Sequence, residues 1–347
     1  MTTKRVESLD WLRGLMAISI MLYHLTGWIY YPLDASSLLG KLGVYGVSIF
    51  FILSGLSMAI VYNTFIQNIE TTIKFYIRRV FRIWPLLWVC IILVIAPNLI
   101  KHGDFDYIKI ISNMTTAFGF YNPTGYINTG AWSIGNEMVY YAFTPFMIFL
   151  YAKQKILGDI FLIITFFIYC FFALVVLDKH LLLSQQWSLY VNPFNNLFLY
   201  CAGLSIYYNL KNYVFKSWHS CMLILISSLL FLIPISGDTI NIVTGVNRFF
   251  FTVASIFLVV GFYKFNQYYL LPKSIKMVLE KFGIATYGVY LFHPIVNMYW
   301  VFFLKQINFL NLELQFIGTI IFTIIAALVS YYFIETRLIK IGKKITA

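Results

Sequence analysis

Long apolar segments alternate with short polar connections along almost the whole chain. Runs of about 18 or more mostly apolar residues recur from end to end, and each is long enough to cross about 30 Å of hydrocarbon as a helix. The pattern therefore predicts an all-α fold, a polytopic membrane bundle of about ten transmembrane helices. The predicted spans are residues 14–31, 42–62, 81–100, 131–151, 158–177, 191–208, 217–235, 246–263, 282–304 and 314–334.

The composition excludes an ordinary water-soluble domain. Of the 347 residues, 61% are hydrophobic and only 11% are charged, which is too few charges to cover a surface exposed to water. Ten spans use up most of this length, so we expect one membrane domain over residues 1–347 with no appended soluble domain. The first apolar run carries Arg13 and has no small-residue cleavage site, so it is interpreted as a retained helix and not a signal peptide.

The formal net charge of +12 is explained by topology and does not indicate nucleic-acid binding. If the N-terminus is cytoplasmic, 19 basic residues fall on the cytoplasmic side, beginning with Lys4 and Arg5, and 6 fall on the other side. The positive-inside rule predicts this asymmetry. We therefore expect both termini in the cytoplasm and the lipid bilayer, rather than nucleic acid, as the partner of the basic residues.

The cysteines predict neither a disulfide framework nor a metal site. All four lie within or at the ends of apolar runs, and no two of them form a C-x-x-C pair. They are Cys90, Cys170, Cys201 and Cys221. We expect free thiols and no bound metal.

Residues 101–130 form the one long connection, which is predicted to be external. The segment is too polar for a confident span and rich in tyrosine, with Tyr107, Tyr121 and Tyr126. It is interpreted either as a re-entrant or interfacial element beside a site, or as an aromatic belt at the level of the lipid headgroups.

Arg13 and His24 are charged or titratable groups inside the first span, where such groups are costly. They are 11 residues apart, so they share a helix face with Asp10 but are separated by about 16 Å of rise. An elongated anionic ligand would meet Arg13 with its phosphates and His24 with its reactive end. The alternative is structural: Arg13 extends to the membrane surface, and His24 bonds a neighbouring carbonyl.

Arg79 and Arg82 lie at the predicted cytoplasmic start of the third span. Because they are three residues apart, they are predicted to lie on one side of the helix and to offer two planar forks to phosphate. The alternative is a positive-inside anchor that contacts lipid headgroups.

The second span contains several small residues around Ser54 and Gly55. Small residues allow a backbone to approach a ligand or a neighbouring helix closely. Ser54 is predicted to lie near the middle of the membrane. Simple helix packing is the alternative interpretation of this segment.

Glu137 and His293 are the remaining titratable groups placed deep inside spans. Glu137 lies about 9 Å from the outer end of its span, a depth close to that of His24, so the two are predicted to form an acid–base pair. His293 is predicted to line the same cavity. The alternatives are a Glu137 that hydrogen-bonds a Trp or Tyr, and a His293 that bonds a carbonyl freed by Pro294.

Together these motifs resemble the acyltransferase-3 family of membrane O-acyltransferases. The matching motifs, in chain order, are Ser8-Leu9-Asp10-Trp11-Leu12-Arg13-Gly14 with His24, Phe50-Phe51-x-x-Ser54-Gly55, Arg79-x-x-Arg82 with Trp84-Pro85, Trp132-Ser133-x-x-x-Glu137, Tyr290-Leu291-x-His293 and Ile334-Glu335-x-Arg337. They span residues 5–337 in the order of the family. Two positions depart from it: Trp11 replaces a small residue, and Ser48 stands where an acidic residue is common.

The resemblance implies acyl-CoA, here acetyl-CoA, as the donor substrate and no bound cofactor. It also implies a carbohydrate acceptor, free or lipid-linked, on the other side of a bacterial cytoplasmic (inner) membrane, such as O-antigen or exopolysaccharide. We expect donor binding by Arg79, Arg82 and Arg13. The expected catalytic residues are His24, as general base or transient acyl carrier, with Glu137, Arg13 and Asp10. Cavity and oxyanion support is expected from Ser54, Gly55, Phe50, Phe51, Trp132 and His293.

Two other classes of function stay open on the residues alone. A flippase or transporter for a lipid-linked glycan also favours an aromatic cavity. A polysaccharide polymerase is disfavoured, because it needs no phosphate site on the cytoplasmic side, where the arginines are predicted. Acyl chain length, acceptor identity and oligomeric state have no signature in the sequence.

Overall fold

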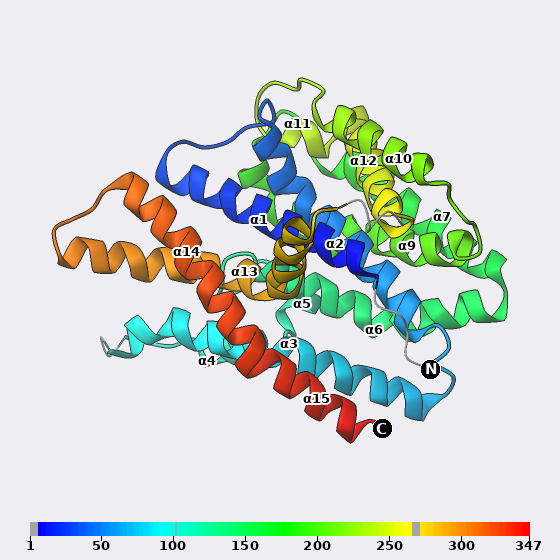
Figure 1. Ribbon diagram of the computed structural model, residues 1–347, viewed down its shortest axis with the longest axis horizontal. Helices are drawn as coiled ribbons and strands as arrows, with labels where there is room; N and C mark the ends of the chain where they lie inside the picture. Colours follow the sequence, from blue (N-terminus) through cyan, green and yellow to red (C-terminus); the bar gives the residue numbers. More distant parts are fainter. Residues whose placement is uncertain (1–5, 101–102, 266–270) are drawn as a thin grey trace.

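The computed structural model describes residues 6–100, 103–265 and 271–347, and these form helices with no strand. Lys4, Arg5 and the first two residues of the segment 101–130 lie outside the described residues. The main helices are α1 (Glu7–Ile29), α2 (Leu38–Tyr62), α3 (Ile69–Ile100), α6 (Ala131–Lys153), α7 (Lys155–Phe171), α9 (Pro193–Leu210), α10 (Ser217–Phe231), α12 (Gly245–Tyr263), α13 (Lys273–Gln306), α14 (Leu312–Ser330) and α15 (Thr336–Ile345). The predicted all-α fold is confirmed (Figure 1).

A helix lies at each predicted span within the described ranges. Among those ranges, 6 helical segments are long and apolar enough to cross a membrane, and α10 is a shorter apolar helix. The six are Glu7–Ile29, Leu38–Tyr62, Ile69–Ile100, Lys155–Val176, Gly245–Tyr263 and Leu312–Ile345. Helices α6 and α9 carry buried asparagines, which lower their mean hydropathy. The chain is therefore a polytopic helical bundle, while the count of ten crossings and the cytoplasmic termini stay predictions.

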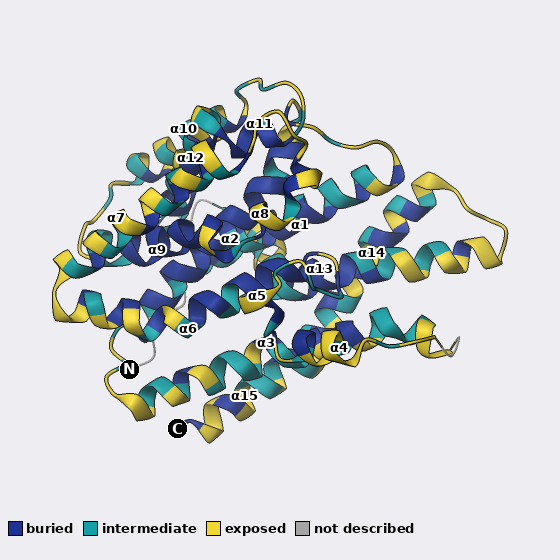
Figure 2. Cartoon of the chain, turned by 180° about the vertical axis from the view of Figure 1, so that it is seen from behind, coloured by how far each residue is buried: buried dark blue, intermediate teal, exposed yellow. Residues whose placement is uncertain are grey.

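Helix α2 is the centre of the bundle, with 78% of its most apolar 18-residue window buried. It packs against α1, α9, α12 and α6. Figure 2 shows the same arrangement, with buried residues along α2 and α9 and exposed residues on the outer faces of α3, α7 and α14. Exposed apolar side chains on the outer helices are expected where lipid replaces water as the solvent.

Gly55 belongs to the closest contact in the bundle, between α2 and α9. A Cβ atom on Gly55 would lie 2.0 Å from the carbonyl oxygen of Tyr200, and one on Gly203 would lie 2.0 Å from that of Ile52. The two backbones therefore touch through a pair of glycines, as small residues allow between membrane helices. Helix packing, the alternative interpretation of this segment, is what the structure shows at Gly55.

Gly55→Ala should destabilise the bundle, because the added methyl group meets backbone that cannot rotate away. We expect a loss of about 1–3 kcal/mol or more, the usual cost of overpacking a core. Gly27→Ala is the matched control, since a Cβ atom there has nothing within 4 Å. Thermal unfolding of both variants in detergent measures the difference, and equal melting temperatures would contradict the α2–α9 contact.

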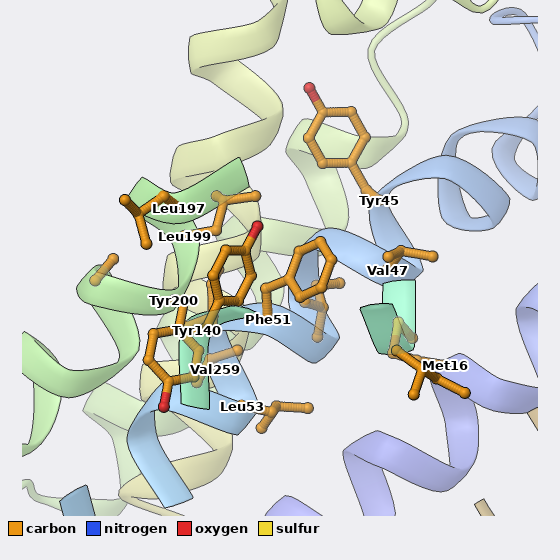
Figure 3. Close-up of a cluster of buried hydrophobic side chains, with 14 of the residues drawn as sticks. Met16, Tyr45, Val47, Phe51, Leu53, Tyr140, Leu197, Leu199, Tyr200 and Val259 are labelled. Carbon is orange, nitrogen blue, oxygen red and sulfur yellow. The ribbon is translucent and has the colours of Figure 1, made fainter. Parts of the chain in front are cut away.

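Phe51 and Trp132, which are predicted cavity residues, belong to the packed core. Phe51 is only 3% exposed, and its ring centroid lies 5.3 Å from that of Tyr140 and 6.2 Å from that of Trp132. Figure 3 shows Phe51 beside Tyr140 among the side chains of α2, α6 and α9. These two residues are therefore packing residues in this structure, since both are buried and in contact with other rings.

Helices α1 and α13 run parallel and in register. A Cβ atom on Gly14 would lie 2.7 Å from the carbonyl carbon of Phe282, and one on Gly283 would lie 2.8 Å from the carbonyl oxygen of Asp10. Further along both helices, Ala17, Met21 and Leu25 pack in one apolar cluster with Ala285 and Val289. This contact sets which residues of the two helices face each other.

The segment 103–130 folds into α4 (Tyr107–Met114) and α5 (Phe118–Tyr121) and is held by two buried asparagines. Asn113 Nδ2 donates to the carbonyl of Gly125 at 2.8 Å, and its Oδ1 accepts from the backbone N–H of Ile127 at 2.8 Å. Asn128 Nδ2 donates to the carbonyl of Leu291 on α13 at 3.0 Å. This placement is consistent with a folded element beside the predicted site, because Leu291 is two residues from His293, and the exposed rings of Tyr107 and Tyr121 are consistent with an aromatic belt.

Candidate functional site

His24 of α1 and His293 of α13 are in direct contact. His24 Nδ1 lies 2.8 Å from His293 Nε2, and the two rings are nearly parallel, with centroids 5.1 Å apart. Trp28, one turn beyond His24, stacks on both rings, with centroid distances of 5.1 Å and 5.8 Å. The His24 ring is therefore directed into the bundle toward α13 and not toward lipid. We call His24 and His293 the histidine pair.

The register of α1 and α13 produces this contact. Each histidine lies 10 residues beyond the glycine of its helix at the Gly14–Gly283 crossing, so parallel helices bring the rings to the same level, about 15 Å along. The prediction that His293 lies with His24 in one site is consistent with this geometry. The structural alternative for His24 is wrong, because the hydrogen-bond partner of its Nδ1 is an imidazole and not a carbonyl.

His293 is fully buried and has a second partner within its own helix. Its Nδ1 lies 3.1 Å from the carbonyl oxygen of Val289, one turn earlier. Pro294 lacks an N–H and frees the carbonyl of Tyr290 instead. The backbone of Tyr290 also acts as a hydrogen-bond partner of the His293 ring, so the alternative interpretation of His293 agrees with the structure, with Val289 as a second acceptor.

Glu137 does not pair with His24, so that prediction is wrong. Its Oε1 accepts short hydrogen bonds from Ser54 Oγ of α2 and from Tyr141 Oη one turn along α6. Depth along a helix is set by the rise per residue, but the direction of a side chain is set by how the helix is rotated in the bundle. The alternative, a Glu137 bonded to a tyrosine, is confirmed, and the Ser54 hydroxyl is used by this contact.

Arg79 points into the bundle and lies in an aromatic cage. Its Nη2 donates to Tyr62 Oη at 2.7 Å, and its guanidinium carbon lies 5.1 Å from the centroid of the Tyr62 ring and 5.7 Å from that of Tyr141. Cation–π contacts of this kind hold a guanidinium in place without using its donors. Within the described residues, Arg79 Nε is buried and has no hydrogen-bond partner.

Arg82 does not share the environment of Arg79. It is exposed, and its guanidinium interacts electrostatically with the carboxyl group of Glu335, in the segment after α14. Residues three apart differ by about 60° around a helix, and α2 and α6 cover the side of α3 that carries Arg79. The predicted double fork is therefore corrected to one enclosed arginine and one arginine at the surface.

Arg13 is held between α1 and α2. Its Nη1 lies 2.8 Å from Asp10 Oδ1, its Nη2 donates to the carbonyl of Leu53 at 3.3 Å, and Nη2 also makes a short hydrogen bond to Ser57 Oγ. The alternative of an Arg13 that reaches freely to the membrane surface is wrong. Asp10 is the ion-pair partner of Arg13 and therefore contributes to the site by holding the Arg13 side chain in place.

The polar residues therefore form two groups along α2. The arginine cluster comprises Arg13, Arg79, Ser54, Glu137 and Tyr141, and its contacts with α2 fall between Leu53 and Tyr62. The histidine pair lies toward the other half of α2, where Tyr23 packs over Gly43. Along α1, the two groups are about 16 Å apart, as predicted from the sequence.

Tyr290 and Ser133 lie between the two groups and were not predicted as site residues. Tyr290 Oη donates to the carbonyl of Gly130 at 2.8 Å and lies 2.7 Å from Ser133 Oγ. The ring of Phe50, a predicted cavity residue, meets that of Tyr290 edge to face at 6.0 Å. Sequence reasoning missed both because Tyr and Ser are common within the apolar helices of this chain. The sequence did contain a signal for both residues, because each is part of a motif that matches the family.

In the part of the chain described, no three His, Cys, Asp or Glu side chains come together as metal ligands.

Two comparisons with known proteins give a match. Residues 6–335 match the family described as an acyltransferase domain. The chain is also similar to the peptidoglycan O-acetyltransferase OatA of Listeria monocytogenes, with 31% identity over 169 residues, which cover 43% of this chain and 25% of that protein. The match thus spans about a quarter of the length of that relative. No solved structure matches the chain significantly.

Proposed function

The chain belongs to the acyltransferase-3 family and is an acyltransferase, and from that premise we propose that it is a membrane O-acetyltransferase using cytoplasmic acetyl-CoA and a carbohydrate acceptor. The predicted resemblance is thereby confirmed. The donor, the acceptor and the residue roles below are the proposal, and the contact between His24 and His293 is the observation that carries it.

An imidazole pair inside the bundle favours group transfer over transport. Neither ring has a carboxylate partner among the hydrogen bonds of the described residues, and His24 is only half-buried. A neutral imidazole with an open nitrogen is suited to accept a proton from a hydroxyl. A flippase for a lipid-linked glycan requires no such base, although its aromatic surroundings would be similar.

The arginine cluster is proposed as the donor site. The guanidinium of Arg79 is held in place by Tyr62, and a planar, charged fork of this kind suits a phosphate of CoA. Arg13 contacts the same half of α2, and Arg82 adds a positive charge at the protein surface. The positive-inside rule supports cytoplasmic termini and ten spans, so this half of the bundle is proposed to face the cytoplasm of a bacterial cell.

The proposed reaction moves one acyl group. The acceptor hydroxyl oxygen attacks the carbonyl carbon of the thioester while His24 takes the hydroxyl proton. The carbon–sulfur bond then breaks, and the proton passes from the imidazolium to the departing thiolate of CoA. The products are an O-acetyl ester and free CoA.

The acceptor is proposed to be a sugar of a cell-surface polysaccharide. The matched relative acts, by its name, on peptidoglycan, which therefore joins O-antigen and exopolysaccharide as a proposed acceptor class. The fold alone does not choose among them, because function depends on the site and not on the scaffold.

Acetyl-CoA labelled in the acetyl group tests the proposal directly. We expect proteoliposomes containing the protein to release free CoA and to label a polysaccharide fraction. Mass spectrometry of surface glycans from cells with and without the gene should show added acetyl groups only when the protein is present. A protein that leaves acetyl-CoA intact while it moves glycan across the bilayer would overturn the proposal in favour of a transporter.

A further inference from the structure

The hydrogen bonds of His293 have a defined direction. A carbonyl oxygen only accepts hydrogen bonds, so the contact of 3.1 Å between Val289 O and His293 Nδ1 requires the proton on Nδ1. A neutral imidazole carries one ring proton, which leaves His293 Nε2 as an acceptor. Because Val289 and His293 lie one turn apart on the same helix, this assignment does not depend on how α13 packs.

The protonation of His293 determines which nitrogen of His24 carries its proton. His293 Nε2 is 2.8 Å from His24 Nδ1, so His24 Nδ1 must be the donor, and the proton of His24 is on that atom. His24 Nε2 is then the unprotonated nitrogen. A second proton on either ring would place an uncompensated charge at the buried contact, because the hydrogen bonds of both rings in the described chain involve no carboxylate.

We propose that His293 is a positioning residue that holds His24 in the tautomer protonated at Nδ1, so that His24 Nε2 is the atom that takes the proton of the acceptor hydroxyl. This inference rests on the proposed function and adds to it the role of a second histidine. The proton is transferred to His24 Nε2 as the new carbon–oxygen bond forms, and it returns from Nε2 to the thiolate sulfur as the carbon–sulfur bond breaks. His293 keeps its own proton throughout.

The stacking of Trp28 and the register of α1 and α13 orient the histidine pair. Trp28 stacks on both rings and restricts their rotation. The crossing at Gly14 and Gly283 fixes the register of the two helices. The base is therefore pre-oriented by packing, and an imidazole in the wrong tautomer would present an N–H to the substrate hydroxyl.

Two substitutions of His293 distinguish the loss of its hydrogen-bond acceptor from the loss of its side-chain volume. His293→Gln keeps an oxygen near the position of Nε2 that can accept from His24, whereas His293→Leu removes the acceptor. We expect kcat to fall about 100-fold in H293L and by about 10-fold or less in H293Q, within the range of general base catalysis. The KM for acetyl-CoA should stay unchanged in both. Equal losses of kcat in the two variants, or a loss that appears only as a higher KM, would overturn the proposal.

A measurement that needs no activity tests the tautomer itself. Nitrogen NMR of protein labelled at its histidines distinguishes a protonated from a bare ring nitrogen. In the wild type at mildly alkaline pH we expect His24 to be bare at Nε2, and in H293L we expect a shift toward protonation at Nε2. The wild type protonated at His24 Nε2 would overturn the inference. If the wild type instead shows the expected tautomer but transfers no acetyl group, the proposed function fails and the assigned tautomer stands.

Discussion

His24→Ala should abolish acetyl transfer while leaving the protein folded in the membrane. The imidazole is the proposed base, and its removal takes away the nitrogen that is proposed to accept the hydroxyl proton. General base catalysis typically contributes about 10²–10⁴-fold, so we expect a loss in kcat of that size. The KM for acetyl-CoA should change little, because the arginine cluster lies about 16 Å away along α1.

Expression and thermal stability show whether the loss at His24 is chemical. His24 is half-buried, so alanine removes ring contacts with Trp28 and His293 as well as the base. His180→Ala removes an exposed histidine in a connection remote from both groups and should leave kcat unchanged. An H24A protein that still transfers acetyl at more than a tenth of the wild-type rate would remove His24 from the chemistry.

Arg79→Ala should raise the KM for acetyl-CoA by about 10- to 100-fold with little effect on kcat. A hydrogen bond to a charged group contributes about 1.5–3 kcal/mol, and each 1.4 kcal/mol corresponds to a factor of about ten in binding. The effect should disappear with acetyl-pantetheine as donor, because that thioester lacks the nucleotide phosphates. Initial rates with the two donors measure the difference.

Arg78→Ala is the matched control for charge. Arg78 precedes Arg79 on α3, but its Nε donates to Thr346 Oγ1 at 2.7 Å and its guanidinium lies over the Phe65 ring. Removing it deletes the same positive charge outside the aromatic cage, so the KM for acetyl-CoA should stay near the wild-type value. If R78A and R79A raise the KM equally, the arginines act through general charge and the cage of Arg79 has no specific role.

The helices of this protein could be predicted well, and the contacts of its site only in part. Each predicted span coincides with a helix, because a lipid-exposed backbone must satisfy its hydrogen bonds internally and long apolar runs have few alternatives. The hydrogen-bond partners of the site side chains could not be predicted from the pattern of apolar runs. Glu137 and His24 were predicted to pair from their similar depth, yet Glu137 bonds Ser54 and Tyr141 while His24 bonds His293.

Arg79 and Arg82 show the same limit for residues on one helix. Their spacing placed both near one side of α3, but only the covering helices α2 and α6 decide that Arg79 is enclosed and Arg82 exposed. Gly55 is the opposite case. Its small size predicted a close approach of some kind, and the structure shows that the neighbour is the backbone of α9.

The sequence by itself therefore determined the helical class, the family motifs and the distance along α1 between Arg13 and His24. Those properties depend on local composition and on a constant rise per residue. Only the tertiary structure decided that α1 and α13 run parallel in register, and hence that two histidines 269 residues apart share a hydrogen bond. The rotation of each helix about its axis depends on side chains from distant segments, and no pattern within one helix contains that information.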